Sequence, residues 1–159
     1  MNMANLKLTP CLWFDKEAEE AANFYVSVFK NSNIDNISYY TKEGFEIHGM
    51  PAGTVLTVSF QLDGNPFTAM NGGPLFKFNE AVSFQIFCET QQEIDFYWDK
   101  LTEGGNEVEC GWLKDKYGLS WQVVPSVLPE LLTDPARAER VMKVLMQMKK
   151  FNIEELLNA

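Results

Sequence analysis

The sequence predicts an α+β protein made of two related halves and a helical tail. Two observations lead to this class. The order strand, helix and further strands occurs twice, and the residues after Pro125 carry helix signals instead of strand signals. A Phe-Tyr pair also lies late in each predicted helix, at Phe24-Tyr25 and Phe96-Tyr97. We interpret this as an internal repeat of about 70 residues, whose halves are small enough that we expect them to share a core.

The first half begins with a strand and a helix. The first strand is predicted from Leu6 to Phe14, and Asp15 then begins a helix with acidic residues near its positive end. The polar segment from Lys30 to Asn36 ends that helix. Asp63-Gly64 is typical of a hairpin between the last two strands. The three strands predicted after the helix are Ile37 to Tyr40, Thr54 to Leu62 and Phe67 to Asn71.

The second half repeats the pattern from Val82 to Cys88, an apolar strand. Thr90 and Glu93 have the spacing of a capping box, which predicts a helix start, and Gly104-Gly105 ends that helix. Two further strands are predicted, Glu107 to Leu113 and Leu119 to Val124. Between them, Asp115 and Gly118 are typical of a turn. The expected third strand does not stand out.

The tail is predicted to be helical, with Asp134-Pro135 as a helix start. An apolar stripe follows, which allows two interpretations: packing against the chain's own sheet, or contact with a second subunit. Its members are Val141, Val144, Leu145 and Met148, with Met142 and Met146 beside them.

Composition excludes several classes of function. The 159 residues include 13 basic and 22 acidic side chains, and the net charge of −9 argues against a nucleic-acid groove or an anionic membrane surface as partner. No segment has the roughly 20 apolar residues that cross a bilayer, and the first residues lack a signal-peptide pattern. The three cysteines have no CxxC spacing. We therefore expect a cytoplasmic protein with reduced thiols.

Several segments together resemble the PhnB-like branch of the vicinal-oxygen-chelate superfamily, a branch that carries the name 3-demethylubiquinone-9 3-methyltransferase domain. The resemblance covers nearly the whole chain, and its most specific stretch is CGWLKDKYGLSWQ; TPCLWFD, AEEAANFYVSVF, MNGGP and SFQIFC also match. It implies two βαβββ modules that form a curved, open mixed sheet around a cleft, followed by C-terminal helices. One domain over residues 1–159 would then comprise module one at about 6–75, module two at about 80–125 and a tail at 126–159.

Glyoxalase-like members of the superfamily bind a divalent metal through four ligands. In this chain the corresponding positions carry neutral oxygens, a thioether or no donor, none of which holds a catalytic divalent ion well. They fall at Thr9 or Pro10, Ala69 or Met70, Ser83 and Gln122. We therefore expect no metal and no cofactor.

The resemblance directs polar side chains of the second module into the cleft. Ser83 and Gln85 alternate on one strand and Ser120 and Gln122 on another, so each pair shares a strand face. Polar side chains on an inward face need hydrogen-bond partners, and two alternatives supply them: a ligand or water in the cleft, or the side chains themselves. The candidate ligand-binding residues are Ser83, Gln85, Cys110, Trp112 and Gln122, with Met70 and Asn71 at the end of module one. Cys110 as a nucleophile would need a base, and His48 is the one histidine.

These observations favour a metal-free protein that binds a small organic molecule, flat or partly apolar. The first alternative is an enzyme of the same superfamily, a lyase, a dioxygenase or the methyltransferase of the family's name. The ten glycines include no GxG turn of the kind that binds S-adenosylmethionine. The second alternative is an oligomeric interaction module. Because the superfamily pairs modules within or between chains, we also expect a homodimer.

Overall fold

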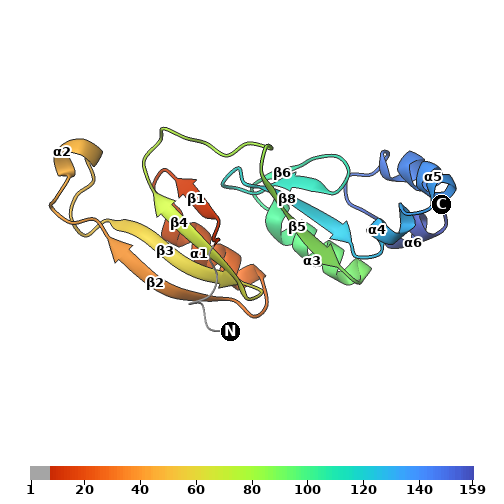
Figure 1. Ribbon diagram of the computed structural model, residues 1–159, viewed down its shortest axis with the longest axis horizontal. Helices are drawn as coiled ribbons and strands as arrows, with labels where there is room; N and C mark the ends of the chain where they lie inside the picture. The colour runs from red at the N-terminus through yellow and green to blue at the C-terminus, as the bar shows by residue number, and fades with distance from the viewer. Residues whose placement is uncertain (1–7) are drawn as a thin grey trace. The chain divides into compact units, whose positions relative to one another are not determined.

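The computed structural model describes residues 8–159, so Leu6 of the first predicted strand lies outside the described residues. The chain divides into two compact units, Met1–Lys77 and Phe78–Ala159 (Figure 1). Each unit holds one βαβββ module with a four-stranded mixed sheet, as the repeat and the resemblance predicted. The single domain with a shared core stays a prediction.

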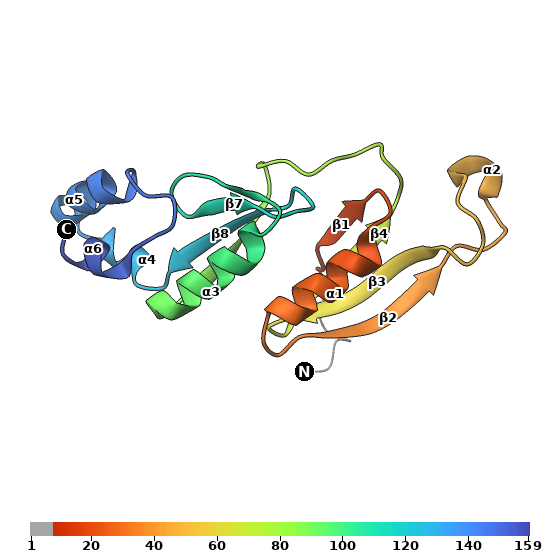
Figure 2. The ribbon, with the colours of Figure 1, turned by 180° about the vertical axis from the view of Figure 1, so that it is seen from behind.

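The first unit contains β1 (Cys11–Phe14), α1 (Ala18–Val28), β2 (Asn33–Tyr39), α2 (Phe45–His48), β3 (Val55–Leu62) and β4 (Asn65–Asn71). Its sheet order is β1-β4-β3-β2, with β1 and β4 parallel. Helix α1 covers one face of this sheet (Figure 2), and the core there includes Tyr25, Val58 and Phe60, all fully buried. The predicted hairpin is confirmed, because Asp63 and Gly64 between β3 and β4 both have positive φ.

Two boundaries in the first unit differ from the prediction. Strand β2 begins at Asn33, inside the segment that we assigned to the end of the helix. It is an edge strand whose side chains are exposed or half-buried, so its sequence lacks an apolar pattern. Helix α1 begins at Ala18, three residues after the predicted start.

The second unit contains β5 (Ser83–Cys88), α3 (Gln91–Thr102), β6 (Asn106–Glu107), β7 (Trp112–Lys114), β8 (Ser120–Pro125), α4 (Leu128–Leu131), α5 (Pro135–Leu145) and α6 (Ile153–Leu157). Its sheet order is β5-β8-β7-β6, and α3 covers one face (Figure 2). The helix start is confirmed: the Thr90 hydroxyl accepts a hydrogen bond from the Glu93 amide at 3.2 Å. The Glu93 carboxylate accepts from the amide of Glu89, one residue before the cap.

The predicted strand from Glu107 to Leu113 is wrong as a single element. The chain leaves the sheet between β6 and β7, where Cys110 and Gly111 have φ values of 57° and 78°. Backbone of the tail binds there: the Cys110 amide donates to the Met148 carbonyl at 2.8 Å and the Gly111 amide to the Lys149 carbonyl at 2.7 Å. The predicted strand is therefore two strands, β6 and β7, and the break between them is bonded to tail residues that are distant in sequence.

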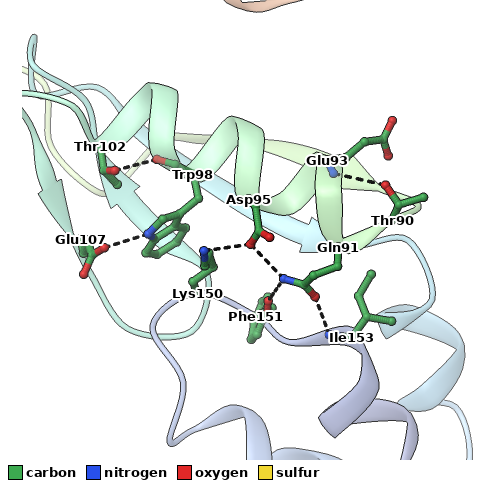
Figure 3. A network of polar contacts seen from close by, with 10 residues as sticks. All are labelled: Thr90, Gln91, Glu93, Asp95, Trp98, Thr102, Glu107, Lys150, Phe151 and Ile153. Carbon is green, nitrogen blue, oxygen red and sulfur yellow. Dashed lines mark hydrogen bonds and ion pairs between the residues drawn. The ribbon is translucent and has the colours of Figure 1, made fainter.

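The tail packs on its own unit, where it contacts α3 and the turn at Cys110 and Gly111; packing against the chain's own sheet and contact with a second subunit both stay predictions. Val141, Leu145 and Met148 are buried within this unit, whereas Met142 and Met146 stay exposed. A polar network fixes the tail to α3 (Figure 3): Gln91 donates to the Phe151 carbonyl at 3.0 Å and accepts from the Ile153 amide at 2.9 Å. A salt bridge of 2.8 Å joins Lys150 to Asp95 in the same network.

Candidate functional site

The sheet of the second unit has one face that α3 does not cover. On the covered face lie the buried residues Ile86 and Val123. Because side chains alternate along a strand, their neighbours in sequence point to the other face. We call this second face the open face and define it by Ser83, Gln85, Phe87, Trp112, Lys114, Ser120, Gln122 and Val124.

One row of the open face runs across three strands. Gln122 in β8 lies beside Trp112 of β7 and beside Gln85 of β5. The Gln122 amide donates to the Ser83 hydroxyl at 2.8 Å, and the Gln85 amide donates to the Gln122 carbonyl oxygen at 3.3 Å. The three polar residues therefore bond to one another, the alternative to ligand binding that the sequence left open. Gln85 remains exposed, so part of its hydrogen-bonding capacity still faces solvent.

The next row consists of Lys114, Ser120 and Ser83, again on β7, β8 and β5. Lys114 forms an ion pair with Glu80, which precedes β5. This contact lowers the pKa of the Glu80 carboxyl, first through the hydrogen bond with Lys114. Ser120 is fully buried, and its hydroxyl has no hydrogen-bond partner among the described residues.

Cys110, a candidate ligand-binding residue, is placed away from these rows. Its sulfur lies 3.8 Å from the Leu145 carbonyl oxygen, in the region where the tail contacts the chain. The residue is half-buried, and its positive φ belongs to the turn that the tail holds. The structure therefore brings Cys110 together with the tail.

Met70 lies in a corresponding row of the first unit. It is half-buried on β4, between Trp13 of β1 and Thr57 of β3. The Trp13 indole donates to the Gly73 carbonyl at 2.9 Å. A Cβ at Gly72 would come within 2.2 Å of that indole ring. Gly72 is thus required by the packing of Trp13, which explains half of the Gly-Gly pair without a ligand.

Asn71, the other candidate in the first unit, is buried and forms a hydrogen bond through each of its two side-chain polar atoms. Its side-chain oxygen accepts a hydrogen bond from the Ala18 amide at 2.8 Å, and its amide donates to the Val55 carbonyl at 3.0 Å. The first contact satisfies a free amide at the start of α1, and the second joins the end of β4 to β3. Asn71 therefore acts as a structural connector of this module.

Both ring nitrogens of His48 are engaged by neighbouring backbone. The Met50 amide donates to Nδ1 at 2.9 Å, and Nε2 lies 3.1 Å from the Glu43 carbonyl oxygen. The ring also lies 4.6 Å from the Tyr40 ring, centroid to centroid. These contacts stabilise the loop around α2 and leave the imidazole little freedom to act as a base.

The residues at the superfamily's metal positions do not fit a divalent ion. Ser83 and Gln122 offer neutral oxygens and bond to each other, while Ala69 has no donor and Met70 has a thioether. Across residues 8–159, no three His, Cys, Asp or Glu side chains are grouped in a way that could hold a metal. No step through a metal follows from these residues.

The buried thiol of Cys88 lies on the covered face of the same sheet. Burial raises its pKa to about 12, and the nearby Glu93 charge adds to the shift. At neutral pH this thiol is therefore protonated and a poor nucleophile.

The fold and these rows define a two-module protein with an open sheet face, and comparison with known proteins gives its family. The family model described as 3-demethylubiquinone-9 3-methyltransferase matches residues 6–124 of this chain. The PhnB protein from Bacillus cereus, whose description carries the same name, is 37% identical, with a TM-score of 0.67 over 76% of this chain and 99% of that one. The chain therefore belongs to the PhnB-like 3-demethylubiquinone-9 3-methyltransferase family of the vicinal-oxygen-chelate superfamily.

Two more distant structures share the fold. PA1353 from Pseudomonas aeruginosa is 17% identical, with a TM-score of 0.59 over 76% of this chain and 97% of that one. The fosfomycin resistance protein FosX from Listeria monocytogenes is also 17% identical, with a TM-score of 0.54 over 83% of this chain and 100% of that one. No curated protein matches the chain. In the described part of the chain, no helix has the length and apolar character to span a membrane.

Sequence reasoning identified Ser83, Gln85, Trp112, Ser120 and Gln122 of the open face but missed Lys114 and its partner Glu80. Lys114 stands two residues after Trp112, so strand alternation puts both on one face and could have revealed it. Glu80 had no such signal, because it precedes the strand and reaches Lys114 only through the fold.

Proposed function

We propose that this protein binds a small organic molecule, flat or partly apolar, on the open face of its second unit and without a metal. The observation that carries the proposal is the row of Trp112, Gln122 and Gln85 beside Phe87, whose side chain is 53% exposed. An aromatic side chain beside paired amides can contact a ring and read its polar edge. α3 does not cover this face, and Gln85 and Phe87 are exposed on it while Trp112 and Gln122 are half-buried.

The experiment uses benzamide, a flat neutral probe, with nuclear magnetic resonance of the side-chain amides of Gln85 and Gln122. Millimolar benzamide should shift both signals. The shift of the Gln85 signal should disappear in Gln122→Leu, and both shifts should persist in Gln92→Leu, because Gln92 is exposed on α3, which covers the opposite face. Unchanged signals in the parent protein with benzamide and with its anionic counterpart benzoate would overturn the proposal.

The family name supplies the second candidate, methyl transfer from S-adenosylmethionine. A micromolar one-to-one isotherm with S-adenosylmethionine in calorimetry would favour it over ligand binding alone. We expect no such binding, since the ten glycines include no GxG turn of the kind that follows a strand, opens a helix and holds the nucleotide.

We further propose that the protein is a cytoplasmic homodimer. Open sheet faces and edge strands require cover, and superfamily members provide it by pairing modules. Light scattering at tens of micromolar should give twice the chain mass, and a monomer mass would contradict the dimer. The stripe of α5 is not the surface to mutate, because Val141 and Leu145 are buried in their own unit.

A further inference from the structure

The row formed by Lys114, Ser120 and Ser83 has hydrogen-bond donors in excess of acceptors. Lys114 is the one basic side chain on the four strands of the second unit's sheet. The Ser83 hydroxyl accepts from Gln122, which leaves its own O–H available to donate. The Ser120 hydroxyl is buried and has no partner among the described residues.

A buried hydroxyl without a partner is rare in folded proteins, because losing its hydrogen bonds to water is unfavourable. Ser120 lies between Lys114 and Ser83 in the register of three neighbouring strands. Adjacent strands are about 4.8 Å apart, so the three side chains leave the same face of the sheet side by side, with Ser120 in the middle of the row. A carboxylate placed there would accept from all three, and charge-assisted bonds of this kind are strong.

We propose that these three residues form the anion-binding end of the open face and that the ligand is a small organic carboxylate. Its acid group binds Lys114, Ser120 and Ser83, and its flat or apolar part lies along the neighbouring row at Trp112 and Gln122. This inference rests on the proposed function, because it assigns the ligand's chemical class to the same face.

In the structure the Glu80 carboxylate forms the ion pair with Lys114 that the ligand's acid group would form. Both side chains of this pair are partly exposed, 31% for Lys114 and 59% for Glu80. Exposed ion pairs contribute little free energy, so an incoming carboxylate can take the place of Glu80.

The test compares benzoate, benzamide and acetate on the full chain. Benzoate and benzamide differ in charge, and acetate carries the charge without the ring. Benzoate is expected to bind at least about tenfold more tightly than benzamide, the factor of one charge-assisted hydrogen bond, and more tightly than acetate. The reporters are the side-chain amide signals of Gln85 and Gln122.

Variants connect the preference to the proposed residues. Lys114→Met should remove the preference for benzoate, while Lys100→Met, on the exposed side of α3, should leave it intact. Glu80→Gln should tighten benzoate binding about threefold, because the competing carboxylate is gone. Ser120→Ala should weaken benzoate binding without loss of stability, since its hydroxyl has no bond to lose in the free protein.

The outcomes separate the two proposals. Equal binding of benzoate and benzamide would overturn the carboxylate assignment and leave the binding function standing. Acetate binding as tightly as benzoate would show that the face does not read the organic part, and would also overturn it. A preference for benzoate that survives Lys114→Met would place the anion elsewhere. If neither benzoate nor benzamide shifts the side-chain amide signals of Gln85 and Gln122, both proposals are overturned.

Discussion

Asp115 holds together the turn between β7 and β8, and its removal should destabilise the second unit. The side chain is 2% exposed and accepts three hydrogen bonds. The Tyr117 amide donates at 2.9 Å, the Leu119 amide at 3.1 Å and the Trp121 indole at 2.8 Å. Since Leu119 and Trp121 are also buried, Asp115→Ala leaves two of these donors without partners in a region closed to water, while the Tyr117 amide is only half-buried.

The expected magnitude follows from these contacts. Each unsatisfied buried donor costs about 1 to 2 kcal/mol, so the loss of the two buried bonds in Asp115→Ala should lower the free energy of unfolding by about 2 to 4 kcal/mol. Asp115→Asn keeps an oxygen for the two backbone amides and turns an NH₂ group toward the Trp121 indole. It should therefore cost about 1 to 2 kcal/mol.

Urea unfolding followed by tryptophan fluorescence measures these losses. A Trp13→Phe background restricts the signal to the second unit, which contains the other three tryptophans. A double-mutant cycle of Asp115→Asn with Trp121→Phe should show a coupling of about 1 kcal/mol. Asp99→Ala, at an exposed position of α3, should change the free energy of unfolding by less than about 0.5 kcal/mol. A loss below about 1 kcal/mol for Asp115→Ala would refute the reasoning.

Four further predictions follow from single contacts. Asn71→Ala should destabilise the first unit by about 2 to 4 kcal/mol. It should also speed hydrogen exchange at the Ala18 amide, which donates to the Asn71 side chain at the start of α1. Unchanged exchange at Ala18 would contradict this structural role of Asn71. Gly111→Ala should cost at least about 2 kcal/mol, because its φ is +78° and a Cβ would lie 2.5 Å from the Phe151 ring. Gly118→Ala, with φ +85° and open space around the added carbon, should cost less, and equal losses in the two variants would contradict the proposed contact. Burial raises the pKa of the Cys88 thiol from 9.0 to about 12, so this group's contribution to stability is full below pH 9 and is lost as the pH rises to about 12. The free energy of unfolding should fall more steeply over that range than in Cys88→Ala, and parallel curves would contradict the shift. Elemental analysis of freshly purified protein should find far less than one transition metal per chain, and a stoichiometric metal lost on mutating the open face would overturn this expectation.

Local patterns were enough to find most elements of the modules. The Asp63-Gly64 turn and the Thr90 helix cap depend on residues a few positions apart, and both are confirmed. The alternation along β5 and β8 also put Ser83, Gln85 and Gln122 on common strand faces, because the strand period of two is written in the sequence. Edge strand β2 was placed late, since an exposed edge needs no apolar pattern.

The sequence by itself determined the α+β class, the repeated module and the family. Each of these depends on residue identity and local order. The tertiary structure alone decided that the tail breaks the strand at Cys110 and Gly111, and that Lys114, Ser120 and Ser83 form one row. These features depend on strand register and on contacts between distant segments, and a sequence specifies them only through the free energy of the whole packed unit.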